Sequence, residues 1–83
     1  MADHWAIRFA RRANEDKYKI PRSEAAQFAE AVSILENGPE LKERQPVEKS
    51  PNTYQYVQNG YLIAYEVLKE EHAIRVVYSE IKD

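Results

Sequence analysis

Alternating hydrophobic and polar residues predict a strand at the start of the chain, and a polar segment predicts a short helix after it. Residues 4–9 place their bulky apolar side chains on one side: Trp5, Ile7 and Phe9. This period-two pattern is typical of a strand with one buried face. Ala10–Lys19 is mostly polar with sparse apolar residues, which favours a short helix that cannot continue through Pro21.

A second helix is predicted from Ala25 to Leu35, because its apolar residues recur at the spacing of an amphipathic helix. These residues are Ala25, Phe28, Ala29, Val32, Ile34 and Leu35. Ser23 is the expected N-cap. Gly38 is expected to end the helix in a left-handed conformation, and Pro39 forbids a further turn.

The second half of the chain is predicted to form a three-stranded antiparallel meander. Asn59-Gly60 predicts a type I′ turn, because both residues readily adopt positive φ between strand-like runs. The flanking strands are residues 54–58 and 61–68, and residues 73–78 form the last strand. Residues 40–53 contain two prolines, so we expect a loop with some edge-strand pairing.

This order, β-α-α-β-β-β, predicts a single α+β domain over residues 1–83, with both helices packed on one face of a mostly antiparallel sheet. Alternation assigns seven side chains to the helix side: Tyr61, Ile63, Tyr65, Val67, Ile74, Val76 and Tyr78. It assigns a mixed set to the opposite, open side: Leu62, Ala64, Glu66, Leu68, Arg75, Val77 and Ser79. A partly apolar open side is either a partner surface or a set of tolerated exposed residues.

The composition of the chain excludes several classes of protein. The 83 residues include no cysteine, which excludes disulfides and thiolate chemistry and suits a reducing cytoplasm. The longest apolar-or-tyrosine run, Tyr61–Tyr65, is far too short to span a membrane, and the charged start is unlike a signal peptide. Residues 1–22 carry six basic and three acidic side chains, whereas the whole chain has a net charge of −2. A dedicated nucleic-acid binder is usually basic overall.

Four segments occur in an informative order: WAIRF (5–9) followed by Ala13 and Ile20-Pro21, ILENGP (34–39), NGYLIAYEV (59–67) and AIRVVY (73–78). Over residues 5–83 the sequence resembles the RelE/ParE superfamily of type II toxin–antitoxin toxins. The resemblance implies that superfamily's α+β fold and a cognate antitoxin partner. It also implies a cellular target, which is the ribosome with its mRNA for the endonucleases and DNA gyrase for ParE-like toxins.

The same resemblance places the usual nuclease chemistry in doubt. Endonucleases of the superfamily hold phosphate with Arg or Lys on the open sheet face, and such charge stabilisation is a large catalytic contribution. This sequence has Leu62 at the usual arginine position and no lysine in residues 54–58. The final arginine position is matched at best by Lys82, with no tyrosine or histidine after it. The catalytic residues are therefore unknown, and Arg75 and Lys82 remain the candidates.

Candidate contact residues divide into two sets. Partner contacts are expected at Leu62, Ala64, Arg75, Arg11 and Arg12. RNA contacts, if the chain makes any, are expected at Arg8, Arg11, Arg12, Tyr54 and Tyr56, because cations contact phosphate and aromatic rings stack on bases. Solvated basic side chains on a helix and ordinary strand packing of tyrosines explain the same residues without a ligand.

Metal and cofactor chemistry is not predicted. His72 follows Glu70 and Glu71, but adjacent side chains in a turn do not converge on one metal ion. The two glycines exclude a glycine-rich phosphate loop. We therefore expect no metal and no cofactor.

Three functions remain open. The first is a toxin-like component of a type II module that acts through protein binding in the cytoplasm, with weak or no RNase activity. The second is an active ribosome-dependent mRNA endonuclease, with charge supplied by Arg8, Arg11, Arg12, Arg75 and Lys82. The third is a small interaction domain without a toxin role, and a homodimer is compatible with it.

Overall fold

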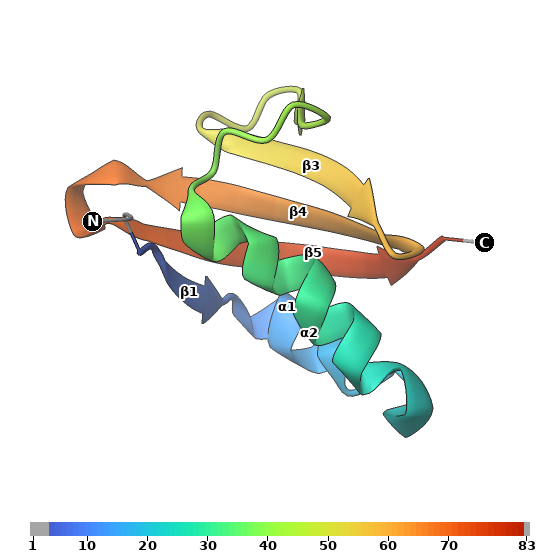
Figure 1. Ribbon diagram of the computed structural model, residues 1–83. Helices are drawn as coiled ribbons and strands as arrows, with labels where there is room; N and C mark the ends of the chain where they lie inside the picture. Colours follow the sequence, from blue (N-terminus) through green and yellow to red (C-terminus); the bar gives the residue numbers. More distant parts are fainter. Residues whose placement is uncertain (1–3, 83) are drawn as a thin grey trace.

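One mixed sheet of five strands, in the order β1-β5-β4-β3-β2, forms the main layer of the structure (Figure 1). The structure is a computed structural model that describes residues 4–82. The strands are β1 (Ala6–Phe9), β2 (Gln45–Pro46), β3 (Thr53–Gln58), β4 (Tyr61–Leu68) and β5 (Ala73–Ile81). Only the pairing of β1 with β5 is parallel. The predicted α+β fold with a mostly antiparallel sheet is confirmed.

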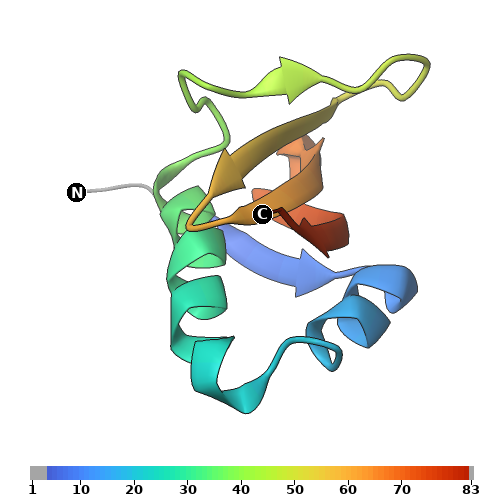
Figure 2. The same cartoon turned by 90° about the vertical axis from the view of Figure 1, so that its right-hand side faces the viewer.

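Two helices pack against this sheet. Figure 2 shows α2 (Ala25–Ser33) lying across one face, while α1 (Arg11–Lys17) follows directly from β1 at the sheet edge. α1 lies beside β5 and contributes its buried Ala13 to the same core as α2. Both helices therefore contribute to one core, α1 from the edge of the sheet and α2 from across its face.

The ends of α2 differ from the sequence expectation. The predicted Ser23 cap is wrong: Ser23 lies inside a 3₁₀ turn (Arg22–Glu24), and no side chain caps the helix that follows. A second 3₁₀ turn, Ile34–Asn37, replaces the predicted last helical turn. Gly38 ends it with φ 130° and ψ 154°, which is a positive φ but not the left-handed helical conformation.

The meander follows the sequence closely. Asn59 (φ 54°) and Gly60 (φ 83°) form the predicted β3–β4 turn with positive φ at both positions. β2 pairs with β3 at the sheet edge, as expected for the proline-containing loop. The predicted last strand is too short, because β5 continues to Ile81.

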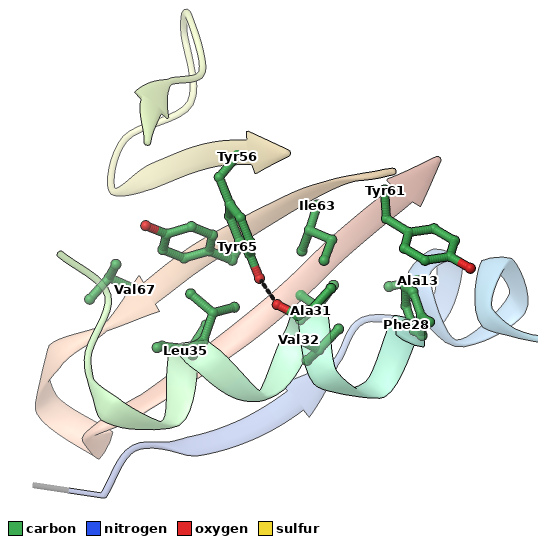
Figure 3. Close-up of a cluster of buried hydrophobic side chains, with 12 residues drawn as sticks. Ala13, Phe28, Ala31, Val32, Leu35, Tyr56, Tyr61, Ile63, Tyr65 and Val67 are labelled. Carbon is green, nitrogen blue, oxygen red and sulfur yellow. Dashed lines mark hydrogen bonds between the residues drawn. The ribbon is translucent and has the colours of Figure 1, made fainter. Parts of the chain in front are cut away.

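The core lies between α2 and the sheet (Figure 3). Leu35 and Ile63 are fully buried at its centre, and the expected helix-side residues of β4 all point into it. The buried apolar core consists of Ala13, Phe28, Ala31, Val32, Leu35, Tyr56, Tyr61, Ile63, Tyr65, Val67, Ile74 and Val76. Burial of this set is the main favourable contribution to folding.

Three of these core residues are tyrosines whose hydroxyl groups bind residues 24–39, called the α2 segment here because it contains α2 and the 3₁₀ turn that follows it. Tyr56 donates to the backbone carbonyl of Ala31 at 2.7 Å (Figure 3). Tyr61 donates to Glu24 Oε1 at 2.8 Å, and Tyr65 donates to the carbonyl of Pro39. The three bonds hold the start, the middle and the end of the α2 segment, which fixes its position over the sheet.

A β-bulge reverses the side-chain alternation in β5. Tyr65 pairs with Val76, but the preceding Ala64 pairs with Tyr78, so Val77 is the extra residue. A bulge shifts all following side chains to the opposite face. The predicted faces of Tyr78 and Ser79 are therefore wrong: Ser79 is buried on the helix side, and Tyr78 lies on the open side.

Replacing Tyr56 by phenylalanine should lower the free energy of unfolding by about 1 kcal/mol, because a buried hydrogen bond is lost. Burial, and then the neighbouring Tyr65, raise the pKa of Tyr56 above its ordinary value in the folded protein. The folded protein therefore retains this proton longer than the unfolded chain, so stability is lost as the pH rises above about 10.

Urea unfolding between pH 8 and pH 11 measures both effects, and the Tyr56→Phe variant should lose less stability over this range than the unmodified protein. The Tyr18→Phe variant is the matched control, because Tyr18 is 78% exposed. Equal pH dependence in the Tyr56→Phe variant and the unmodified protein would contradict the prediction.

Candidate functional site

The open face of the sheet, meaning the face opposite α2, carries a short row of Ala6, Ala73 and Leu68 at one end and three further rows beyond it. Paired residues of neighbouring strands share a face, so the register defines each row. The three further rows are Arg8-Arg75-Glu66-Thr53, then Tyr78-Ala64-Gln55, then Glu80-Leu62-Val57. These three rows run from an end with paired charges near β1 to an end near the β3–β4 turn, where Leu62 and Val57 lie beside Glu80.

At the charged end, each arginine binds a carboxylate. Arg75 donates to Glu66 Oε1 across the β4–β5 pair, and Arg8 Nη1 donates to Glu71 Oε1 at 2.6 Å. These partly exposed ion pairs add little stability, but they neutralise the two cations that the first row presents. A phosphate group would have to displace a carboxylate from either of them.

In the middle row, two hydrogen-bonded side chains shield the residue between them from solvent. Tyr78 donates to Gln55 Oε1 at 3.2 Å, and Ala64 lies between these two residues in the register. Ala64 is consequently 0% exposed. The prediction that Ala64 contacts a partner is therefore wrong, because the bulge in β5 places the Tyr78 ring beside it.

The third row borders a hollow of about 470 Å³ at the end near the β3–β4 turn. Leu62 and the 54% exposed Val57 pair across β3 and β4 and form its apolar part. The hollow is lined by Glu43, Gln45, Gln55, Tyr56, Val57, Leu62 and Lys82. Leu62 is thus on the open face and partly accessible, as the sequence predicts. Lys82 reaches the same hollow, and its backbone N–H donates to the carbonyl of Gly60.

The basic residues of α1 flank the open face. Arg12 places its guanidinium carbon 5.2 Å from the centre of the Tyr78 ring, and its Nε lies 3.9 Å from Asp16 Oδ2. Asp16 also accepts the backbone N–H of Ser79 at 3.3 Å, which joins α1 to β5. Arg11 has a 95% exposed side chain, with its Nε 3.6 Å from Glu15 Oε1. Arg12 therefore borders the open face, while Arg11 extends from α1 into solvent.

The two tyrosines predicted to stack on RNA bases do not lie on this face. Tyr56 is buried under α2, and Tyr54 lies on the same side, with its ring 5.9 Å from that of Tyr65. The guanidinium carbon of Arg44 lies 3.9 Å from the centre of the Tyr54 ring. Burial excludes the stacking role predicted for Tyr56, whereas the role of Tyr54, which is only partly buried, stays a prediction.

Sequence reasoning missed Gln55, Val57 and Tyr78 as residues of the open face. The register fixed by the Asn59-Gly60 turn pairs Val57 with Leu62, so alternation along β3 was the available signal for Val57 and Gln55. No such signal exists for Tyr78, because the bulge that exposes it leaves no mark in the sequence pattern.

Within residues 4–82, no three His, Asp or Glu side chains are grouped closely enough to hold a metal ion. In the same part of the chain, no helix is both long and apolar enough to cross a membrane.

No protein-family model matches this chain, and a search of curated proteins finds no relative. Solved structures do match. A chain of the RelBE2 toxin–antitoxin complex from Mycobacterium tuberculosis has a TM-score of 0.82 at 19% identity, covering 99% of this chain and 95% of that one. The isolated RelE toxin of E. coli has a TM-score of 0.77 at 17% identity, covering 95% of this chain and 85% of that one.

A chain of an archaeal RelE–RelB complex from Pyrococcus horikoshii is also similar in structure, with a TM-score of 0.70 at 17% identity. The match covers 99% of this chain and 97% of that one. At these identities the likeness establishes a shared fold. The chain therefore has the RelE-like fold that its sequence motifs predict.

Proposed function

We propose that this chain, which has the fold of the RelE toxins, is the toxin-like component of a type II toxin–antitoxin module and acts by binding proteins. Its direct partner is a cognate antitoxin, and its cellular target is a protein in the cytoplasm. Four of the matched structures are complexes with an antitoxin or an antitoxin peptide, and this supports an antitoxin as the partner.

The composition of the open face is the observation that carries the proposal. Arg75 and Arg8 are bound by Glu66 and Glu71, and the opposite end of the face presents Leu62 and Val57. Phosphoryl chemistry needs uncompensated cations where negative charge develops. The hollow beside Leu62 and Val57 combines this apolar pair with polar and charged neighbours, which instead fits a side chain of a protein partner. The face therefore favours protein binding over RNA cleavage.

The antitoxin segment that we propose is acidic and covers the hollow beside Leu62 and the adjoining Arg12. Its apolar side chain fills the hollow between β3 and β4. Its carboxylates interact with the exposed side chains of Arg11 and Arg12, whose contacts with Glu15 and Asp16, at 3.6 and 3.9 Å, are longer than the Arg8–Glu71 contact at 2.6 Å. Extended and helical segments both dock on such surfaces.

Expression of the chain with and without the product of the adjacent gene tests the proposal. We expect growth inhibition by the chain alone, rescue by the adjacent product, and recovery of the two proteins as one complex. Absence of both inhibition and complex formation would favour a small interaction domain without a toxin role.

A cleavage assay on translating ribosomes separates the protein-binding function from the nuclease alternative. We expect no mRNA cleavage by the purified chain. Cleavage that disappears in the Arg75→Ala/Lys82→Ala double variant would overturn the protein-binding proposal and establish the endonuclease.

Reversing the charge of α1 should slow association with the antitoxin. In the Arg11→Glu/Arg12→Glu variant, we expect the association rate constant to fall roughly tenfold at low salt, because electrostatic steering is lost. Stopped-flow mixing at two salt concentrations measures this rate. Lys42→Glu/Lys49→Glu is a control of equal charge change on the loop before β3. An equal decrease in both variants would exclude a specific role for Arg11 and Arg12.

A further inference from the structure

A second hollow lies on the α2 side of the sheet, remote from the open face. Its volume is about 620 Å³, which falls within the range of small-molecule sites. It lies between the end of the α2 segment, the start of β1 and the end of β4. The lining residues are Trp5, Ile34, Asn37, Gly38, Pro39, Glu40, Leu41, Val67 and Lys69.

The aromatic wall of this hollow is held in place. The Trp5 ring stacks on His72 with a centroid separation of 4.0 Å, and the Trp5 backbone N–H donates to the carbonyl of Glu36 at 2.9 Å. A Cβ atom added to Gly38 would lie 3.9 Å from Trp5 Nε1, so the indole nitrogen faces the Gly38 backbone across a short gap. Within residues 4–82 the indole N–H has no protein acceptor and is not buried, so it is available as a donor for a ligand.

The opposite wall is equally fixed. The carbonyl of Pro39 accepts bonds from the Tyr65 hydroxyl on β4 and, within its own loop, from Arg44 Nη1 and the Leu41 backbone N–H. The loop that carries Leu41 is therefore closed on itself and anchored to β4. A cavity with both walls fixed needs little rearrangement to accept a ligand, which favours binding.

The lining of this hollow carries one cation, Lys69, and one carboxylate, Glu40. Within the described part of the chain the Lys69 ammonium has no carboxylate within 4.0 Å. Two smaller hollows share Lys69 with it: one adds Arg44, and the other adds Glu70 and Glu71, of which Glu71 binds Arg8. An anionic group can therefore bind the Lys69 ammonium without displacing a carboxylate.

We propose that this hollow binds a small organic anion with a flat apolar body. The body packs between Trp5, Leu41 and Val67, and the anionic group binds the Lys69 ammonium. The Trp5 indole N–H and the Asn37 amide are within the same lining and supply further donors. Nothing in this assignment depends on the toxin-like function, because the hollow and the open face lie on opposite sides of the sheet.

The probe for this site is 1-anilinonaphthalene-8-sulfonate, which combines a flat aromatic body with one sulfonate. Trp5 is the single tryptophan of the sequence, so the ¹H–¹⁵N spectrum contains one indole signal. We expect saturable binding of one probe molecule, with shifts of the Trp5 indole and Gly38 amide signals and none at Leu62. Shifts centred on Leu62, or no saturation, would overturn the proposal.

Variants then test the role of charge. Lys69→Gln should weaken binding of the sulfonate probe roughly fivefold or more, because an interaction with a charged group is lost. The same change should alter binding of uncharged N-phenyl-1-naphthylamine less than twofold. Lys42→Gln is the matched control, because Lys42 neighbours Leu41 in sequence but does not line the hollow. Equal effects of Lys69→Gln on both probes would refute the assigned role of Lys69.

Discussion

A Leu62→Asp variant is expected to bind the antitoxin about 30-fold more weakly than the unmodified protein, or worse. Leu62 contributes to the apolar part of the hollow on the open face, where a partner side chain would exclude water. A carboxylate buried at that point loses hydration without gaining a partner, and truncating or charging such a central residue typically costs about 2 kcal/mol or more. Isothermal titration calorimetry against the purified antitoxin measures the loss.

Ala29→Asp is the matched control for this variant. Ala29 is exposed on the outer side of α2, so the same charge is added away from the open face. We expect the control to retain the affinity of the unmodified protein, and both variants to keep its unfolding midpoint. Full affinity in the Leu62→Asp variant would remove the open face from the antitoxin interface.

Shortening Leu35 to alanine should lower the free energy of unfolding by about 2–5 kcal/mol. Leu35 is fully buried where the α2 segment meets the sheet, and its neighbours are fixed by the tyrosine hydrogen bonds above them. The surroundings therefore cannot collapse into the space that is left. For a domain of this size, such a loss is a large part of the total stability.

Urea unfolding followed by circular dichroism measures this loss, with Ile81→Ala as the control. Ile81 is 50% exposed at the end of β5, so its truncation should change stability by less than about 1 kcal/mol. A smaller loss for Leu35→Ala than for Ile81→Ala would show that the core described here is not the stabilising one.

Local sequence patterns predicted the meander and much of the core. The positive φ values at Asn59 and Gly60 follow from residue type, and the turn they form sets the register of β3 and β4. Once that register is known, alternation places Tyr61, Ile63 and Tyr65 in the core. These predictions succeeded because turn geometry and side-chain period are both local properties.

The unpredicted features depend on contacts between distant segments. The bulge at Val77 exposes Tyr78 and covers Ala64, yet neither residue differs from an ordinary strand residue. Ser23 has the chemistry of a cap, but the chain enters α2 through a 3₁₀ turn instead. For the candidate site, alternation placed Leu62, Glu66 and Arg75 on the open face. The bond between Arg75 and Glu66 and the pairing of Leu62 with Val57 emerged only from the register of the assembled sheet.

The parallel pairing of β1 with β5 joins the two ends of the chain. Ala6 pairs with Ala73, which lies 67 positions later. A nascent chain therefore cannot complete this sheet until β5 has left the exit tunnel. Such a high contact order slows folding, because a long loop must close before the pairing is gained. Translation that stops before residue 73 would leave β1 without its neighbour, so partial products should lack the assembled fold.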